Sequence, residues 1–159
     1  MANFRARTAT FLATVTALLL VLLFGNSSYS HWVEHHAAGT SAGDLFLQQL
    51  AWPRWGFSGN DSTRTLFVED LKAILVVVLT WVFVLLVGRG PWSGLRAGIS
   101  HFLHGWAAYM FAGAFAGLIA AFFASNASFA GALAIASSGV VYGLIVGWIV
   151  GLVTLASDG

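Results

Sequence analysis

Four long apolar runs constrain this chain more than any other feature of its sequence. A helix needs about 20 predominantly apolar residues to cross a hydrocarbon core about 30 Å thick. Four segments approach or exceed that length, at about 8–25, 66–88, 102–124 and 129–156. Peptide groups inside lipid must be hydrogen-bonded within the protein, so runs this long and continuous favour helices over barrel strands. We therefore predict an all-α integral membrane protein with four transmembrane helices in a single membrane domain.

The composition supports the same class and excludes others. Hydrophobic residues make up 58% of the chain and charged residues only 8%, whereas soluble domains carry roughly 25% charged residues. Seven Lys and Arg are scattered along a chain of formal net charge +1, which provides no basic stripe for nucleic acid. The chain contains no cysteine, which excludes disulfides, thiolate metal sites and thiol nucleophiles. The expected partners are membrane lipids and other membrane proteins.

The first apolar run has a second interpretation, as a secretory signal peptide. Arg5 and Arg7 precede it, and Ser28 and Ser30 follow it where a signal peptidase would favour small residues. A signal peptide usually has an apolar region of about 7 to 15 residues, and this run is longer. We expect a retained transmembrane helix.

Lys and Arg near the helix ends predict the orientation, because cytoplasmic loops carry an excess of them. Arg5 and Arg7 precede the first helix, and Arg89 and Arg96 lie in the short inner linker, 89–101. The long loop on the other side dilutes its own charges. We expect both termini in the cytoplasm, and the richness in Ala, Gly and Val suits a bacterial inner membrane.

The long outer loop, about 26–65, should have some structure of its own. Ser41, with Asp44 three residues later, matches the capping box that starts a helix. That helix should end near Trp52 and Pro53, because proline disfavours a helical conformation in the residue before it. Its leucines and the tryptophans beyond it suit the headgroup layer. We predict a short amphipathic interfacial helix, with a docking surface for a partner as the alternative.

The segment HWVEHH most resembles a metal-binding or catalytic motif. It contains H-x-x-E-H, in which two imidazoles hold a metal and a carboxylate acts as a base. On a helix, His31 and His35 would lie one turn apart with Glu34 beside them, so Zn or Cu at these three residues is one hypothesis. However, zinc takes three or four protein ligands, and residues 25–28 should break the helix before the motif. We expect a polar collar anchored at the interface by Trp32.

His101 and His104 form a second histidine group, on the inner side. They are three residues apart on one helical face and could hold a haem or a quinone head group. Haem-binding bundles usually place their axial histidines on facing helices within the bundle core. We expect an interfacial cap here too, across the membrane from His31 and His35.

Ionisable side chains are missing from most of the predicted membrane region. Residues 97–157 contain no Asp, Glu, Lys or Arg. The hydrocarbon portions of the first two helices hold only Lys72, whose long side chain can extend toward the surface. Pumps and proton relays use intramembrane ionisable groups, so we expect neither. Hydroxyl groups could still line a path for a neutral solute, and the candidates are Thr80, Tyr109, Ser137, Ser138 and Tyr142.

Glycine at every fourth position, a glycine zipper, is the strongest pattern in the sequence. The fourth predicted helix reads SSGVVYGLIVGWIVG, and the third adds two glycines. Small residues at this spacing let helix backbones approach closely in lipid. Either this face packs on a neighbouring helix of the same chain, or it receives a second membrane protein. The six glycines are Gly113, Gly117, Gly139, Gly143, Gly147 and Gly151.

Together these features predict a non-catalytic small membrane subunit. It would pack by its small-residue helix faces against other membrane proteins or against a copy of itself. One alternative is a small oligomeric pore or transporter for a neutral or lipidic solute. A second alternative is an outer-face metal-binding protein that uses HWVEHH.

Overall fold

The computed structural model describes residues 2–55, 62–87, 97–124 and 128–157. Across these ranges the regular secondary structure is helical, with one isolated β-bridge. The helices are α1 (Ala2–Phe24), α2 (Ser27–His36), α3 (Ala42–Leu50), α4 (Thr63–Val87), α5 (Ala97–Phe122) and α6 (Phe129–Ala156).

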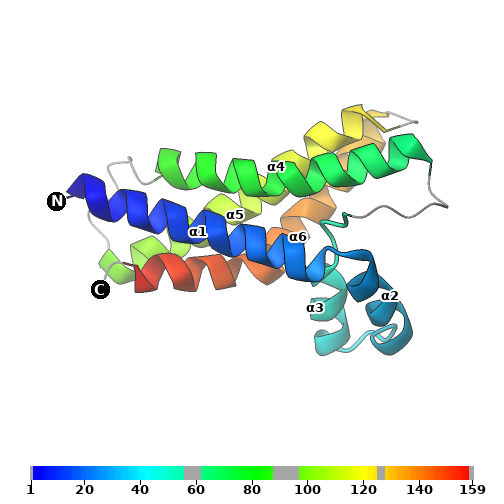
Figure 1. The fold of residues 1–159 in the computed structure, drawn as a ribbon, viewed down its shortest axis with the longest axis horizontal. Helices are drawn as coiled ribbons and strands as arrows, with labels where there is room; N and C mark the ends of the chain where they lie inside the picture. The colour runs from blue at the N-terminus through cyan, green and yellow to red at the C-terminus, as the bar shows by residue number, and fades with distance from the viewer. Residues whose placement is uncertain (1, 56–61, 88–96, 125–127, 158–159) are drawn as a thin grey trace.

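The four long helices α1, α4, α5 and α6 form an up-and-down bundle (Figure 1). The most extensive contact joins α5 to α6, followed by α4 to α5, and α1 contacts both α4 and α6. Each long helix therefore has two neighbours in a closed ring. Both chain ends lie at one end of this bundle, whereas α2 and α3 lie toward the other (Figure 1).

Three of the long helices have the length and apolar composition needed to cross a membrane. These segments are Arg7–Phe24 in α1, Ile99–Phe122 in α5 and Phe129–Ala156 in α6. They correspond to three of the four predicted spans. The chain is therefore an all-helical protein suited to a membrane.

The remaining predicted span, about 66–88, falls in α4, and α4 is not one of the three candidate spans. The first ten residues of α4 carry Arg64, Glu69, Asp70 and Lys72, and charged groups are costly in hydrocarbon. That α4 crosses the membrane therefore stays a prediction. Arg89 and Arg96, on which the predicted orientation partly depends, lie outside the described residues.

The chain turns sharply between α1 and α2. The predicted helix break does occur, but only Gly25 and Asn26 interrupt the helices, so HWVEHH is itself helical. The Asn26 side chain caps α2 by accepting a hydrogen bond from the Tyr29 N–H at 2.8 Å. A side chain at Gly25 would collide with the Pro53 backbone, which explains why glycine occupies this turn.

The helix α3 starts with the local chemistry that the capping-box pattern indicates. Ser41 Oγ accepts a hydrogen bond from the Asp44 N–H at 3.2 Å, and the Asp44 carboxylate accepts one from the Ser41 N–H at 3.3 Å. Leu50 at its end is buried. Whether α3 lies at a membrane interface stays a prediction.

Residues 26–55, which we call the cap, are tied to the end of α1 mainly through Trp55. The Trp55 N–H donates to the Gly25 carbonyl at 2.8 Å, and its indole Nε1–H donates to the Val21 carbonyl at 2.9 Å. The Val21 carbonyl also accepts from the Gly25 N–H at 2.8 Å, so Trp55 adds a second bond there and satisfies the Gly25 carbonyl just beyond the helix end. The cap is therefore fixed against the bundle.

Candidate functional site

The three residues of the predicted metal site lie on α2, and the structure shows how one of them is used. The Glu34 carboxylate pairs with Arg54 at 3.0 Å, and a His31 nitrogen lies 3.8 Å from the same carboxylate. Within the described residues, no group of three or more His, Asp or Glu is arranged to hold a metal. Zn or Cu at His31, Glu34 and His35 therefore stays a prediction that this geometry does not strengthen.

The second histidine group, His101 and His104, lies near the start of α5, far from α2 along the bundle (Figure 1). The rings of His101 and His104 are 6.5 Å apart, and His104 Nδ1 lies 3.5 Å from Ser100 Oγ. The His101 carbonyl accepts a hydrogen bond from Thr154 on α6 at 2.9 Å. This contact joins the ends of α5 and α6, and cofactor binding at the two imidazoles stays a prediction.

The six glycines of the small-residue pattern lie where α5 meets α6. A Cβ placed on Gly117 would be 2.6 Å from the Ile135 carbonyl oxygen, and one on Gly151 would be 2.8 Å from the Phe102 carbonyl oxygen. Both contacts are to backbone of the partner helix. Gly113, Gly139 and Gly143 also meet backbone of the partner helix, whereas a Cβ on Gly147 would first meet the Trp106 side chain at 2.9 Å. The glycine face is thus occupied within the chain.

The five hydroxyl groups considered as a solute path make contacts within the protein. Thr80 and Ser137 donate to carbonyls of their own helices at 2.6 and 2.8 Å. Ser138 donates to a carbonyl on its own helix and accepts from Trp52. Tyr109 and Tyr142, both fully buried, hydrogen-bond to each other through their hydroxyls. The two tyrosines therefore join α5 to α6, Ser138 joins the cap to α6, and Thr80 and Ser137 bond within their own helices.

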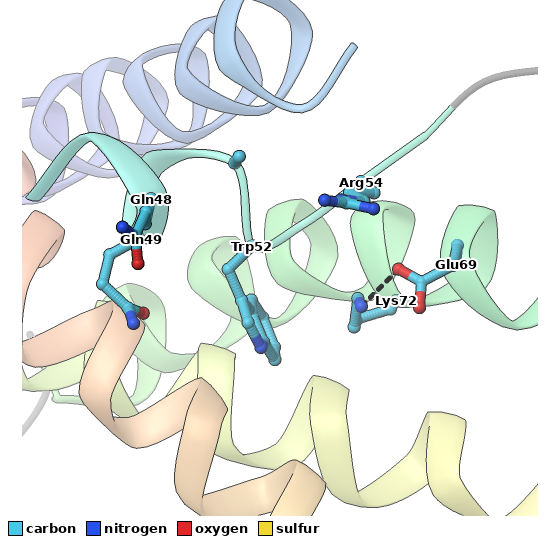
Figure 2. Close-up of a pocket in the computed structure, with 7 residues that line it drawn as sticks. Gln48, Gln49, Trp52, Arg54, Glu69 and Lys72 are labelled. Carbon is cyan, nitrogen blue, oxygen red and sulfur yellow. Dashed lines mark hydrogen bonds and ion pairs between the residues drawn. The ribbon is translucent and has the colours of Figure 1, made fainter. Parts of the chain in front are cut away.

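A polar pocket lies between the end of α3, the segment that follows it, and α4. Its volume is about 340 Å³, and Figure 2 shows the side chains around it. We call it the α3–α4 pocket. Its lining residues are Gln48, Gln49, Ala51, Trp52, Arg54, Glu69 and Lys72.

Lys72 is the most buried charged residue of this pocket. Its side chain is only 9% exposed, and its ammonium group is paired with the Glu69 carboxylate one helical turn away. The same ammonium lies 4.9 Å from the centre of the Trp52 ring, within the range of a cation–π interaction. The expectation that Lys72 extends to the surface is therefore wrong, because a carboxylate and an aromatic ring hold its charge inside.

Trp52 forms one wall of the pocket and anchors the cap on the bundle. Its indole Nε1–H donates to Ser138 Oγ on α6 at 3.0 Å. Its ring stacks on Tyr142 with ring centres 5.1 Å apart. In Figure 2 the ring stands between the two glutamines and the group formed by Arg54, Glu69 and Lys72.

Arg54 and Gln49 have hydrogen-bonding capacity beyond the contacts described so far. Arg54 is about half exposed and uses one terminal nitrogen for Glu34, whereas a guanidinium carries five N–H donors. The side-chain oxygen of Gln49 is buried and has no hydrogen-bond partner among the described residues. A buried acceptor without a partner costs about 1–3 kcal/mol, so a ligand or water that donates to it would be favoured.

Sequence reasoning identified individual residues of this pocket but did not bring them together. The spacing of Glu69 and Lys72, three apart on a helix, is a recognisable ion-pair signal. The glutamines of α3 line the pocket together with Trp52, which bonds to Ser138 on α6. No periodicity in the sequence indicates this long-range contact. No family model, curated protein or solved structure matches this chain.

Proposed function

We propose that this chain is a small non-catalytic membrane protein that binds a small polar or amphiphilic ligand in the α3–α4 pocket. The observation that carries the proposal is the pocket's charge. Lys72, Glu69 and Arg54 line a cavity of about 340 Å³ beside a bundle whose helices α1, α5 and α6 are apolar enough to span a membrane. Of the three side chains, Lys72 is the one largely removed from water, while Arg54 and Glu69 are partly exposed. Removing an ionised group from water costs several kcal/mol, so the Lys72 charge kept at this cavity is a functional-site hypothesis by default.

The proposal includes a membrane setting for the whole bundle. We take α4 as a fourth span because it packs in one ring with the three apolar helices. The cap then lies on the outer side of a bacterial inner membrane, and both termini lie in the cytoplasm. Their position at one end of the bundle is compatible with this orientation (Figure 1).

A role as a subunit of a larger membrane complex is a second proposal. It is favoured by an apolar stripe on α1, where five large side chains are each more than 40% exposed: Phe11, Leu18, Leu19, Leu22 and Leu23. The glycines are not free for this purpose, because they contact the neighbouring helix. Lipid covers an apolar stripe as readily as a partner does, so ligand binding is the preferred proposal.

The test compares two variants that break the same ion pair. Arg54→Gln removes a pocket residue, whereas Glu34→Gln removes its partner outside the pocket. Exposed ion pairs contribute only about 0–1 kcal/mol to stability, so both variants should fold. Native mass spectra of protein released gently from its own membrane should show a retained ligand in the wild type and in Glu34→Gln. The ligand should be depleted in Arg54→Gln.

Two results would contradict this proposal. One is a wild-type protein that retains no small molecule or lipid. The other is equal retention by all three proteins. A fixed heteromeric stoichiometry in the same spectra would instead support the subunit role.

A further inference from the structure

The position of the α3–α4 pocket relative to the apolar helices indicates where its ligand comes from. Trp55 bonds to the last turn of α1, where the candidate span Arg7–Phe24 ends. Trp52 lies three residues earlier and forms the pocket wall. On α4, Lys72 is followed by residues 73–86, which are apolar apart from Thr80. Tryptophan and lysine at the ends of apolar helices are typical of the headgroup layer of a membrane.

The charged side chains that line the pocket are of both signs. Arg54 and Lys72 are cationic, and Glu69 is anionic with its side chain 34% exposed. Glu69 uses one carboxylate oxygen for Lys72. Figure 2 shows these three side chains on the same side of the Trp52 ring. The group therefore offers N–H donors for an anion and, beside them, a carboxylate for a cation.

This layout matches a ligand that carries a phosphate and an ammonium group close together. Arginine binds phosphate through two parallel N–H donors, and lysine adds a point charge. A carboxylate beside the phosphate site disfavours a second negative charge but accepts hydrogen bonds from a primary ammonium. Head groups of zwitterionic phospholipids have this pair of charges.

We propose that the α3–α4 pocket binds the head group of a zwitterionic phospholipid with a primary ammonium. The phosphate lies against Arg54 and Lys72, and the ammonium lies against Glu69. This inference rests on the proposed function, because it names the ligand class of the same pocket. It adds that the pocket prefers zwitterionic to anionic phospholipids, and that Glu69 determines this preference.

The experiment reconstitutes the full chain in lipid nanodiscs that contain equal amounts of phosphatidylethanolamine and phosphatidylglycerol. Native mass spectrometry after mild release counts the lipids that stay bound. Loss of a charge-assisted hydrogen bond corresponds to about tenfold in affinity. The wild type should retain phosphatidylethanolamine over phosphatidylglycerol by about that factor, and Arg54→Gln should lose both lipids.

Two carboxylate variants on α4 test the selectivity. Glu69→Gln should reduce the preference to less than about twofold, because its amide no longer attracts a cation. Asp70→Asn makes the same change at the adjacent position, which does not line the pocket, and should keep the wild-type preference. Since Glu69→Gln leaves Lys72 without its carboxylate, each variant is first checked for a wild-type unfolding midpoint. Should Glu69→Gln fail that check, the wild-type preference and Arg54→Gln decide.

The outcomes separate this inference from the proposed function. Retention of phosphatidylglycerol at or above phosphatidylethanolamine would overturn the zwitterion assignment but leave ligand binding intact. Displacement of the bound lipid by millimolar inorganic phosphate or free phosphoethanolamine would point to a soluble ligand and overturn the lipid assignment. Absence of any retained lipid or solute would contradict the proposed function as well.

Discussion

Replacing Trp52 by alanine should weaken the docking of the cap on α4 and α6, while the four long helices stay assembled and the Trp55 contacts with α1 stay in place. Trp52 makes three contacts that join the cap to other helices. They are the hydrogen bond to Ser138, the stacking on Tyr142 and the cation–π contact with Lys72. The α5–α6 contact, which is the most extensive in the bundle, does not involve the cap.

The expected loss follows from these contacts. A hydrogen bond contributes about 1 kcal/mol, an aromatic pair about 0.5–1.5 kcal/mol beyond its buried area, and a partly desolvated cation–π contact about 1–2 kcal/mol. The total of about 3 kcal/mol lies at the lower end of the range for Trp→Ala in cores, which suits a side chain that is only partly buried. That free energy corresponds to a factor of about 150 in the equilibrium between docked and undocked cap.

Hydrogen exchange measured by mass spectrometry reports this equilibrium directly. Amides of α3 should exchange about 100-fold faster in Trp52→Ala, while amides of α5 and α6 should keep their protection. Trp32→Ala is the matched control, because Trp32 lies on α2 and is 46% exposed. The exchange rates of the α3 amides should change little in this variant. Unchanged protection of α3 in Trp52→Ala would refute the reasoning, and so would equal loss in α5 and α6.

Three further predictions concern packing, charge and pH. Gly117→Ala should destabilise the protein by about 1–2 kcal/mol, because its Cβ would meet backbone of α6. In Gly43→Ala the Cβ makes only an ordinary contact, so this variant should gain about 0.5 kcal/mol in its free energy of unfolding. Thermal unfolding in detergent checks both. Lys72→Met should cost about 2 kcal/mol by leaving Glu69 without its cation, and adding Glu69→Gln should recover part of that loss. Burial raises the pKa of Tyr29 above its ordinary value of 10.0. Its contribution to stability is therefore fully present below pH 10 and is lost as the pH rises through the folded-state pKa. A pH titration of unfolding should show a fall in stability above pH 10, and Tyr29→Phe should make that fall smaller.

Features that depend on local sequence were predictable. The apolar runs of α1, α5 and α6 matched the 20-residue requirement of a span, since hydrocarbon leaves a chain few options besides a helix. The start of α3 followed from Ser41 and Asp44, because both members of a capping box lie within one turn. The helix break at Gly25 was predicted, but the prediction extended it over residues 25–28, whereas it covers only Gly25 and Asn26. Asn26 caps α2 so effectively that the helix resumes after two residues.

Features that depend on contacts between distant residues were not predictable. Glycine spacing indicates a close helix contact but does not name the partner, and the partner of the α6 glycines is α5 of the same chain. Lys72 was expected at the surface, because nothing in its neighbourhood along the chain predicts that Trp52 packs beside it. The pocket depends on that long-range contact between the cap and α4.

The α3–α4 pocket has a structural origin in the unequal lengths of the bundle helices. The α1 helix has 23 residues and α6 has 28, and α1 ends at Phe24 where the chain turns aside into α2. The segment that follows α3 returns to the end of α1, where Trp55 bonds to the Gly25 and Val21 carbonyls. This irregular segment contributes Trp52 and Arg54 to the pocket lining, and α4 contributes Glu69 and Lys72. Lys72 is held by the Glu69 carboxylate and the Trp52 ring, so its charge stays in the bundle through an ion pair and a cation–π contact.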